Sequence, residues 1–313
     1  MKNRTIYVFL AAILALSMAA CSSEKPPENS GSTVKSSPSA TSIPETSAPP
    51  ETTAPLNDSG TLGEFDIQIH DFEICPDYSG KPAILIGYTF TNHSEKTTSA
   101  MAELLGQAYQ NGLQLDTAII MSNDNFNSSD SMKDLKPGAS IDLKCAYSLI
   151  SETSPVEFEM SQAFSFTNDK LGKTFNISDG GVTELSTAPV GDTSEDIGDY
   201  IVSIVSHKIT EDYEGKKAIL FELGYTNNSS KTTSFISSID FSAFQDGVEL
   251  ETAILSNEYS GTGASQMRNL RPGAGASVSI AFIMTSDTSP VEIEIEELFA
   301  FSGKKIETVV SMS

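Results

Sequence analysis

The feature that most constrains this chain is an internal repeat. Shifted against itself by 135 residues, the stretch Phe65–Phe166 aligns with Tyr200–Phe301 without a gap, and about 38 of the 102 aligned pairs are identical. Self-similarity at a fixed spacing indicates that one structural unit is present twice. A residue kept in both copies serves the common fold or a common site, whereas a residue found in only one copy cannot serve a function that both share.

The residues kept in both copies are mostly those of turns. Asn111–Gly112 recurs as Asp246–Gly247, and Asn-Gly and Asp-Gly supply the positive φ angles of a type I′ hairpin turn. Lys136–Gly138 recurs as Arg271–Gly273, with Pro and Gly at the two central positions of a type II turn. These motifs predict hairpins and sharp turns at the same places in both copies.

Between the turns, large apolar side chains occur at every second position. This holds for Ala83–Phe90 and its counterpart Ala218–Tyr225, and again for Ile141–Leu149 and Ala276–Met284. A period of two is that of a strand with one face in the core. Several short strands per copy, turn signals between them and no sustained helical period predict an all-β chain of two tandem immunoglobulin-like antiparallel β-sandwiches.

Composition divides the rest of the chain. The stretch 22–60 is rich in Ser, Thr and Pro with almost no large apolar side chain, so it cannot bury enough surface to offset its ordering entropy. We therefore expect a signal peptide at 1–20, a lipidated cysteine and disordered stalk at 21–60, the first sandwich at 61–178, a linker at 179–198 and the second sandwich at 199–313.

Five short motifs occur in both copies. In the first copy they are Asp77-Tyr78-x-Gly80-Lys81, Thr91-Asn92-x-Ser94, Gln110-Asn111-Gly112, Lys136-Pro137-Gly138 and Ser154-Pro155-Val156-Glu157. Together they resemble domain-of-unknown-function family 5067, which is found in lipoproteins of Gram-positive bacteria. The resemblance covers both repeats, about two thirds of the chain. It implies an immunoglobulin-like fold similar to that of the secreted immunoprotective extracellular antigen, and it implies no activity.

The N-terminus has the pattern of an export signal. Two basic residues, an apolar run over Ile6–Met18 and the small pair Ala19–Ala20 precede Cys21. The run of roughly 15 residues is shorter than the roughly 20 that cross a bilayer. Leu16–Cys21 resembles a lipobox, with Met18 where Leu is usual. We expect two acyl chains on Cys21 to anchor the protein to the outer face of the membrane; a plain secreted protein is the alternative.

The chain is strongly acidic. Its 42 acidic and 19 basic residues give a formal net charge of −23. Such a surface repels phosphate polymers, which argues against nucleic acid and anionic-lipid headgroups as partners. It is also expected to keep the protein soluble and monomeric. A surface that attracts cations is the other interpretation of the same charge.

The histidines give no shared metal site or general base. His70, His93 and His207 have Val205, Asn228 and Phe72 as counterparts, so no histidine is kept in both copies. No pair of histidines has metal-ligand spacing. We therefore expect no zinc or copper site and no cofactor.

Cys75 and Cys145 are both in the first copy. Because Cys145 lies on the apolar face of a predicted strand, it is interpreted first as a small buried hydrophobic residue. Export to an oxidising compartment leaves a disulfide between the two open. The second copy has Thr210 and Ile280 there, so the fold does not need the bond.

The acidic, Asn-rich stretch Asn123–Asp130 raises a calcium hypothesis, because Asp and Asn oxygens are hard ligands. It lacks the spacing and the Glu of an EF-hand loop, and its counterpart, 258–265, keeps a single acid. The favoured interpretation is a long exposed loop that differs between the copies and could carry specificity.

No catalytic motif stands out. The sequence has no Gly-x-Ser-x-Gly elbow, phosphate-binding loop or dinucleotide fingerprint. Polar residues kept in both copies are interpreted as satisfying backbone groups in a connection; they are Asn92, Thr97, Thr98 and Gln110, with Asn227, Thr232, Thr233 and Gln245. We predict a non-enzymatic binding module with an envelope protein or glycan partner. The alternative is an envelope protein that binds or senses a small solute or metal ion.

Overall fold

The computed structural model describes residues 56–121, 123–165, 167–191, 193–255, 262–298 and 304–312. All of them belong to one compact unit, Pro49–Ser313. The predicted signal peptide, Cys21 and nearly all of the predicted stalk lie outside the described residues. No helix in the described part of the chain is long and apolar enough to cross a membrane.

The first copy of the repeat has eight strands, one short α-helix and one 3-10 turn. They are β1 (Ser59–Leu62), β2 (Phe65–Pro76), β3 (Pro82–Asn92), α1 (Ala100–Glu103), β4 (Leu104–Gln110), β5 (Leu113–Gln114), η1 (Ser128–Met132), β6 (Ser140–Ser148), β7 (Val156–Gln162) and β8 (Lys170–Phe175).

The second copy repeats this order, with an α-helix in place of the 3-10 turn. Its elements are β9 (Thr193–Ile197), β10 (Tyr200–Glu211), β11 (Lys217–Asn227), α2 (Phe235–Ser238), β12 (Ile239–Gln245), β13 (Val248–Glu249), α3 (Thr262–Met267), β14 (Gly275–Ile283), β15 (Val291–Glu297) and β16 (Lys305–Val310).

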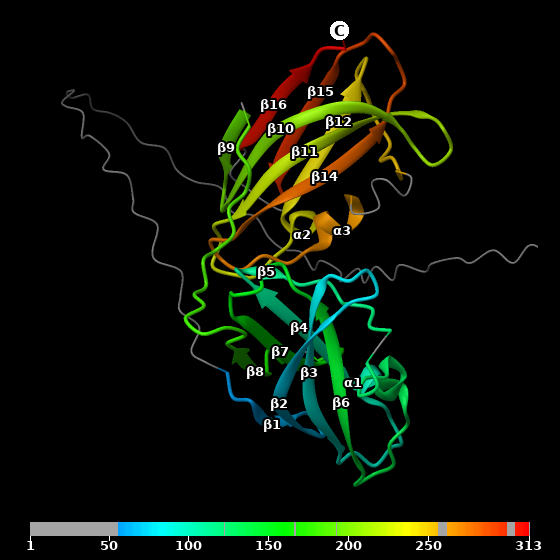
Figure 1. The fold of residues 1–313 in the computed structure, drawn as a ribbon. Coiled ribbons are helices and arrows are strands. Elements are labelled where there is room, and N and C mark those ends of the chain that lie inside the picture. The colour runs from blue at the N-terminus through cyan, green and yellow to red at the C-terminus, as the bar shows by residue number, and fades with distance from the viewer. Residues whose placement is uncertain are drawn as a thin grey trace, which may run out of the picture. The chain divides into compact units, whose positions relative to one another are not determined.

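Each copy forms two antiparallel four-stranded sheets (Figure 1). In the first copy the strand orders are β1-β2-β3-β6 and β5-β4-β7-β8, and in the second they are β9-β10-β11-β14 and β13-β12-β15-β16. With β1 or β9 set aside, this is the A-B-E and C′-C-F-G arrangement of immunoglobulin-like sandwiches. The predicted fold class is confirmed.

The core of each sandwich lies between its two sheets. Ile84, Ile86 and Phe90 of β3 are fully buried and pack in one cluster with Val156 and Phe158 of β7. The equivalent side chains of β11 and β15 form the core of the second sandwich. Alternate residues of β3 face this core, so the period of two in the sequence correctly predicts which face of the strand is buried.

The predicted turns are formed. Asn111 and Asp246 have φ angles of 54° and 52° and are followed by Gly112 and Gly247 with positive φ. Both central residues of a type I′ turn need positive φ, which Asn, Asp and Gly reach at the least cost. Each turn joins the two strands of a hairpin, β4–β5 or β12–β13.

The second sandwich begins earlier than the sequence predicted. Strand β9 (Thr193–Ile197) lies inside the expected linker and pairs with β10. Its sequence, TSEDI, is polar because three of its five side chains are exposed at the sheet edge. A strand of this kind has no apolar alternation by which to recognise it.

Candidate interaction surfaces

Asn92 and Asn227, kept in both copies, are part of the scaffold. Asn92 is completely buried, and its Nδ2 donates to the carbonyl oxygens of Lys96 at 2.8 Å and Leu135 at 2.9 Å, while its Oδ1 accepts from the Ser94 amide at 2.9 Å. Asn227 repeats these bonds. Their amide groups are used up within the fold, as predicted from the sequence.

Gln110 and Gln245 have the same kind of role. Gln110 is buried, and its Nε2 donates to the carbonyl oxygens of Ser151 and Ser154 at 2.9 and 2.7 Å. Its Oε1 accepts from the amides of Ile150 and Ser151. Gln245 makes equivalent bonds to the loop before β15. The asparagines and glutamines that the copies share therefore hold loops of the fold. Of the shared threonines, Thr98 donates to Glu103 at 2.6 Å and Thr232 accepts from Arg271 at 3.4 Å.

The three histidines lie apart in the structure. His93 Nε2 is 2.8 Å from a carboxylate oxygen of Asp66, and His70 Nε2 is 2.5 Å from the Thr89 hydroxyl. His207 packs against the ring of Phe221 in the second sandwich. Within the described residues no group of three or more His, Cys, Asp or Glu side chains is placed to hold a metal ion.

Cys75 and Cys145 are free thiols in the structure. Cys75 of β2 pairs with Ala83 of β3, whereas Cys145 of β6 pairs with Ile86 on the opposite side of β3. Two strand spacings already separate such residues by roughly 10 Å, beyond the roughly 7 Å that a disulfide spans between Cα atoms. Burial raises the pKa of the Cys145 thiol to about 12, as expected for a core residue.

The loop considered for calcium uses its side-chain oxygens locally. Asn123 Oδ1 accepts from the Asn125 amide, and Asn127 Oδ1 accepts from the amide and hydroxyl of Ser129 at the start of η1. Asn123 also donates to a carboxylate oxygen of Glu73. The first half of its counterpart in the second copy lies outside the described residues.

The two sandwiches meet at a joint made of backbone pairing. Leu113 in β5 of the first sandwich forms an antiparallel bridge with Leu270 of the second. The Gln114 amide donates to the Asn269 carbonyl at 3.0 Å, and the Arg271 amide donates to the Gly112 carbonyl at 2.8 Å. The segment before β14 thus extends the β4–β5 hairpin of the first sandwich as a short added strand.

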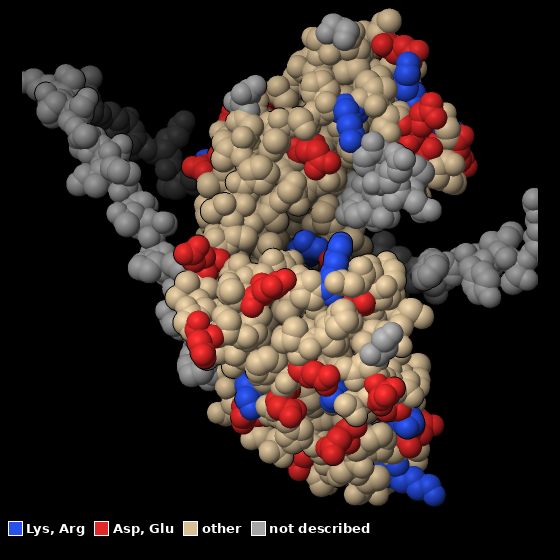
Figure 2. Space-filling model, in the orientation of Figure 1, with Lys and Arg blue, Asp and Glu red and all other residues tan. Residues whose placement is uncertain are grey.

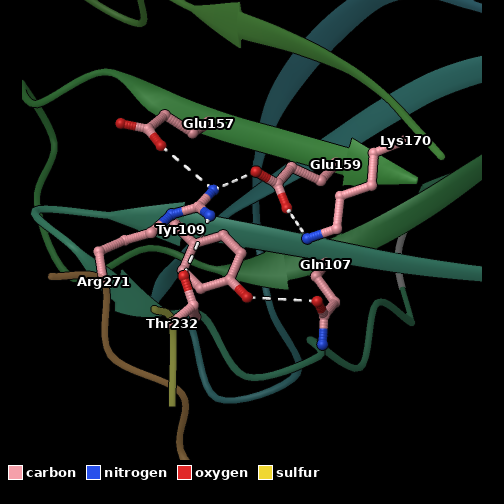
Figure 3. A network of polar contacts seen from close by, with 7 residues as sticks. All are labelled: Gln107, Tyr109, Glu157, Glu159, Lys170, Thr232 and Arg271. Atoms are coloured by element: carbon pink, nitrogen blue, oxygen red, sulfur yellow. Dashed lines mark hydrogen bonds and ion pairs between the residues drawn. The ribbon is translucent and has the colours of Figure 1, made fainter. Parts of the chain in front are cut away.

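Arg271 is the central side chain of this joint (Figure 3). Its guanidinium forms an ion pair with Glu159 and lies 3.4 Å from a carboxylate oxygen of Glu157. The guanidinium carbon is 4.0 Å from the centre of the Tyr109 ring. A desolvated cation stacked on an aromatic face contributes about 1–2 kcal/mol. Arg271 therefore joins the turn of the second sandwich to β4 and β7 of the first.

Glu159 shows the electrostatic balance at the joint. Its side chain is 12% exposed and also accepts from Lys170 Nζ at 2.9 Å. Burial acts to raise the pKa of Glu159, but hydrogen bonds from Lys170 and Arg271 and the attraction of both cations outweigh it and lower the pKa. The carboxylate is thus held ionised between two cations.

A second ion pair lies at the edge of the joint. Arg268 donates to a carboxylate oxygen of Asp116 at 2.6 Å, and both residues belong to segments that already pair through their backbones. The linker joins in as well, because the Ser186 amide donates to the Asn111 carbonyl and the Gly275 amide donates to the Ser186 carbonyl.

Beyond Ser186 the linker lies on the outer face of the second sandwich. A Cβ at Gly224 would meet the Pro189 carbonyl oxygen at 1.8 Å, and one at Gly275 would meet the Ala188 nitrogen at 2.4 Å. The Gly191 amide donates to the Ser203 hydroxyl at 2.6 Å. Glycine is needed where another backbone approaches this closely.

Among the residues that the structure describes, no segment covers the same face of the first sandwich. It carries Thr89 and Ser140 where the second has Gly224 and Gly275. A shallow cavity of about 400 Å³ lies there, lined by hydroxyl, amide and carboxylate side chains and some backbone; the residues are Ser59, Gly60, Thr61, Asp66, Ile67, Gln68, Thr89 and Thr91. We call it the polar groove.

Side chains in and beside the polar groove are hydrogen-bonded to one another. Thr61 donates to Asp66 at 2.7 Å, Thr89 donates to Asp142 at 2.6 Å, and the hydroxyls of Thr91 and Ser140 lie 2.8 Å apart. The hydrogen bond from Thr61, reinforced by His93, holds the pKa of Asp66 below its usual value. The face is therefore a set of ordered hydrogen-bonding groups, and Asp66, the carboxylate that lines the groove, is ionised at neutral pH.

Acidic side chains are scattered over the face of the molecule shown in Figure 2 and are not gathered into one patch. Several are paired at the surface, as Glu73 is with Lys144 and Asp287 with Lys217. Exposed pairs of this kind contribute little to stability. On this face the negative charge is thus spread over the surface.

Sequence reasoning found the scaffold residues but missed the joint and the polar groove. The motif around Arg271 predicts only a turn, because the stacking of Arg271 on Tyr109 depends on the contact between the sandwiches. A signal was present, because Gly224 and Gly275 occur in a single copy. A glycine unique to one copy points to a close approach that only that copy has.

Comparison with solved structures gives matches of low similarity. A proposed lipoprotein of Staphylococcus aureus matches with 12% identity over 40% of this chain and 92% of its own, with a TM-score of 0.32. A protein of Enterococcus faecalis matches with 20% identity over 39% of this chain and 91% of its own, with a TM-score of 0.31. An exo-chitosanase of Amycolatopsis orientalis has 10% identity over 77% of this chain and 26% of its own, with a TM-score of 0.21. A search of curated proteins gave no match.

A family model matches both copies. The model described as "Domain of unknown function (DUF5067)" covers residues 41–162 and 182–297, well over half of the 313 residues. Each match contains most strands of one sandwich, in agreement with the motifs shared by the copies. The chain belongs to the DUF5067 family and carries two tandem copies of its domain.

Proposed function

We propose that this chain is an envelope lipoprotein, held to the outer face of the membrane through Cys21, whose two sandwiches form one non-enzymatic binding unit. Its ligand is an extended segment of an envelope partner protein, bound in the polar groove. The signal-like N-terminus and the predicted stalk support the location. The observation that carries the binding role is the contrast between the two equivalent outer faces.

The second sandwich supports an extended polypeptide as the kind of ligand that suits the polar groove. Its outer face is covered by the chain's own Ala188–Gly191, which lies close over Gly224 and Gly275 and donates to Ser203. A face of this fold can therefore accept an extended chain. In the first sandwich the equivalent face is lined with hydrogen-bonding groups, and no segment of the described part of the chain covers it.

The side chains of the polar groove suit binding better than catalysis. Hydroxyls and a carboxamide can pair with the N–H and C=O groups of an extended peptide. Thr89, which lies near His70, donates its hydroxyl to the exposed carboxylate of Asp142. The Thr89 hydroxyl thus lies between His70 and Asp142. In a catalytic triad the carboxylate instead hydrogen-bonds to the histidine, and the histidine to the hydroxyl.

A titration of the mature chain tests the groove. The soluble form, with Cys21→Ser, is titrated with the peptide Ser-Thr-Ala-Pro-Val-Gly, which copies the linker, and in parallel with peptidoglycan fragments, sugars, calcium and zinc. We expect saturable amide shift changes around Gln68, Thr89 and Thr91 with the peptide. Thr89→Lys should abolish them, and Thr153→Lys, away from the groove, should not.

Other outcomes reassign the ligand. Saturable binding of a sugar or a cation at the groove, without binding of the peptide, would replace the peptide ligand by that class. Binding that survives Thr89→Lys would remove the groove from the proposal. The anchor is tested separately: Cys21→Ala should release the protein from the membrane fraction, and unchanged retention would contradict lipidation.

A further inference from the structure

We propose that copies of this chain associate head to tail through an intermolecular version of the joint. Two surfaces are involved. The tail surface is the end of a sandwich formed by the β4–β5 hairpin and β7, or by β12–β13 and β15; the head surface is the turn segment before β6 or β14. Within one chain, the tail of the first sandwich meets the head of the second. One head and one tail are left over.

The leftover tail, on the second sandwich, keeps the acidic groups of the joint. Glu292 and Glu294 stand where the first sandwich has Glu157 and Glu159, and Phe244 replaces Tyr109. Lys305 Nζ lies 3.8 Å from Glu294, as Lys170 lies beside Glu159. The acceptor for a cation is thus already built there.

Exposure shows that this tail is open. At the tip of the occupied tail Gly112 is buried and Leu113 packs against the core of the second sandwich. At the leftover tail Gly247 is exposed, with no atom within 4 Å of a Cβ placed on it, and Val248 is 62% exposed. An apolar side chain that is covered in one copy remains uncovered in the other.

The leftover head, on the first sandwich, carries the matching cations. Lys133 and Lys136 occupy the positions of Arg268 and Arg271, and both are exposed. The turn Lys136–Gly138 keeps the shape of its counterpart, with Gly138 at φ 79° and Gly273 at φ 82°. A repeat of the joint would place Lys136 opposite Glu292 and Glu294, and Lys133 opposite Glu251, the counterpart of Asp116. The leftover surfaces therefore have complementary charge.

Symmetry makes this association directional. The joint is heterologous, because different surfaces of the same fold meet in it, and a heterologous contact repeats head to tail into a ring or an open chain. The rotation and translation that superpose the first sandwich on the second can be applied once more, to the second sandwich. This would place the first sandwich of another molecule on the leftover tail. Two tails facing each other would instead oppose Glu292 and Glu294 with like charges.

The contact between molecules should be weaker than the joint within one. Lysine is a point charge and lacks the planar guanidinium with which arginine binds carboxylates through two hydrogen bonds. In addition, no linker holds the two surfaces together. Anchoring of many molecules on one membrane raises their effective concentration, which for short tethers reaches the order of millimolar. We therefore expect reversible association that matters on the cell surface and is sensitive to salt.

Sedimentation of the mature chain with Cys21→Ser, from about 10 µM to about 1 mM at low salt, tests the proposal. The wild type should associate with rising concentration. Lys133→Glu with Lys136→Glu (head variant) and Glu292→Lys with Glu294→Lys (tail variant) should each weaken association at least about tenfold. Lys144→Glu with Lys208→Glu, which reverses as many charges on the outer sheet faces, should not.

Mixing decides the direction. The tail variant's intact head can meet the head variant's intact tail, and the two reversed surfaces also carry opposite charges. The equimolar mixture should therefore associate, although each variant alone is monomeric. A wild type that stays monomeric throughout, or a control pair that weakens association as much, would overturn the proposal. So would an equimolar mixture that remains monomeric. Peptide binding in the groove is measured separately and does not depend on these outcomes.

Discussion

The two sandwiches share a core and a strand order but differ in what covers them. The outer face of the second is occupied by the linker, and its head surface is held by the first sandwich. The first has its tail surface occupied and its outer face open. Differences between the copies therefore lie where their surroundings in the chain differ. Duplication kept the scaffold, while each copy adapted to its position.

The scaffold should respond equally in both copies. Asn92→Ala and Asn227→Ala each remove bonds to two buried carbonyls and one amide. We expect a loss of about 3 kcal/mol of unfolding free energy for each, because buried backbone groups lose their partners. Chemical denaturation measures the loss, and a difference of more than about 1 kcal/mol between the two variants would show that the copies are not equivalent.

The outer faces should respond unequally to exchange of their residues. Gly224→Thr places a side chain where the Pro189 oxygen lies, so we expect a loss of about 2–3 kcal/mol together with displacement of the linker. The reverse change, Thr89→Gly, costs only about 1 kcal/mol, as glycine does in a strand. Amide shifts of Ala188–Gly191 report the displacement; a linker that stays in place would contradict the packing described.

The sequence predicted the fold because the turns and the alternating pattern are local signals. Asn111–Gly112 and the apolar positions of β3 need only their neighbours to be interpreted. The joint is different, since Arg271 and Glu159 are 112 residues apart. Neither segment contains a sequence pattern that predicts contact with the other. Likewise the polar groove lies on a face that no described segment covers, which is a property of tertiary packing. Strand β9 was missed because a polar edge strand has no alternation.

Substitution of an acidic residue in the joint should destabilise the fold more than substitution of its exposed counterpart in the second sandwich. Glu159→Ala removes the carboxylate closest to Arg271, whose side chain is largely buried. We therefore expect a loss of about 2 kcal/mol of unfolding free energy. Glu294→Ala, at the exposed equivalent position, should cost less than about 0.5 kcal/mol in a dilute sample. Thermal unfolding of the two variants under identical conditions makes the comparison, and equal losses would argue against a formed joint.

The smallest expected effect is one of pH. The pKa of Glu159 is lowered in the folded chain from its ordinary value of 4.5, so its ionised form stabilises the fold above that value. This contribution is lost as the pH falls below about 4.5 toward the folded-state pKa, because protonation removes the charge that Lys170 and Arg271 bind. Glu159→Gln should flatten this part of the pH–stability curve relative to the wild type, and a curve of unchanged slope would contradict the assignment.

The central claim is that the two sandwiches are fixed to each other by the joint. Residual dipolar couplings of the mature chain with Cys21→Ser measure this directly, because each sandwich reports its own alignment tensor. We predict one common tensor for both sandwiches, and two different tensors after Arg271→Ala with Arg268→Ala. Different tensors in the unsubstituted protein would show that the sandwiches move independently and would contradict the account.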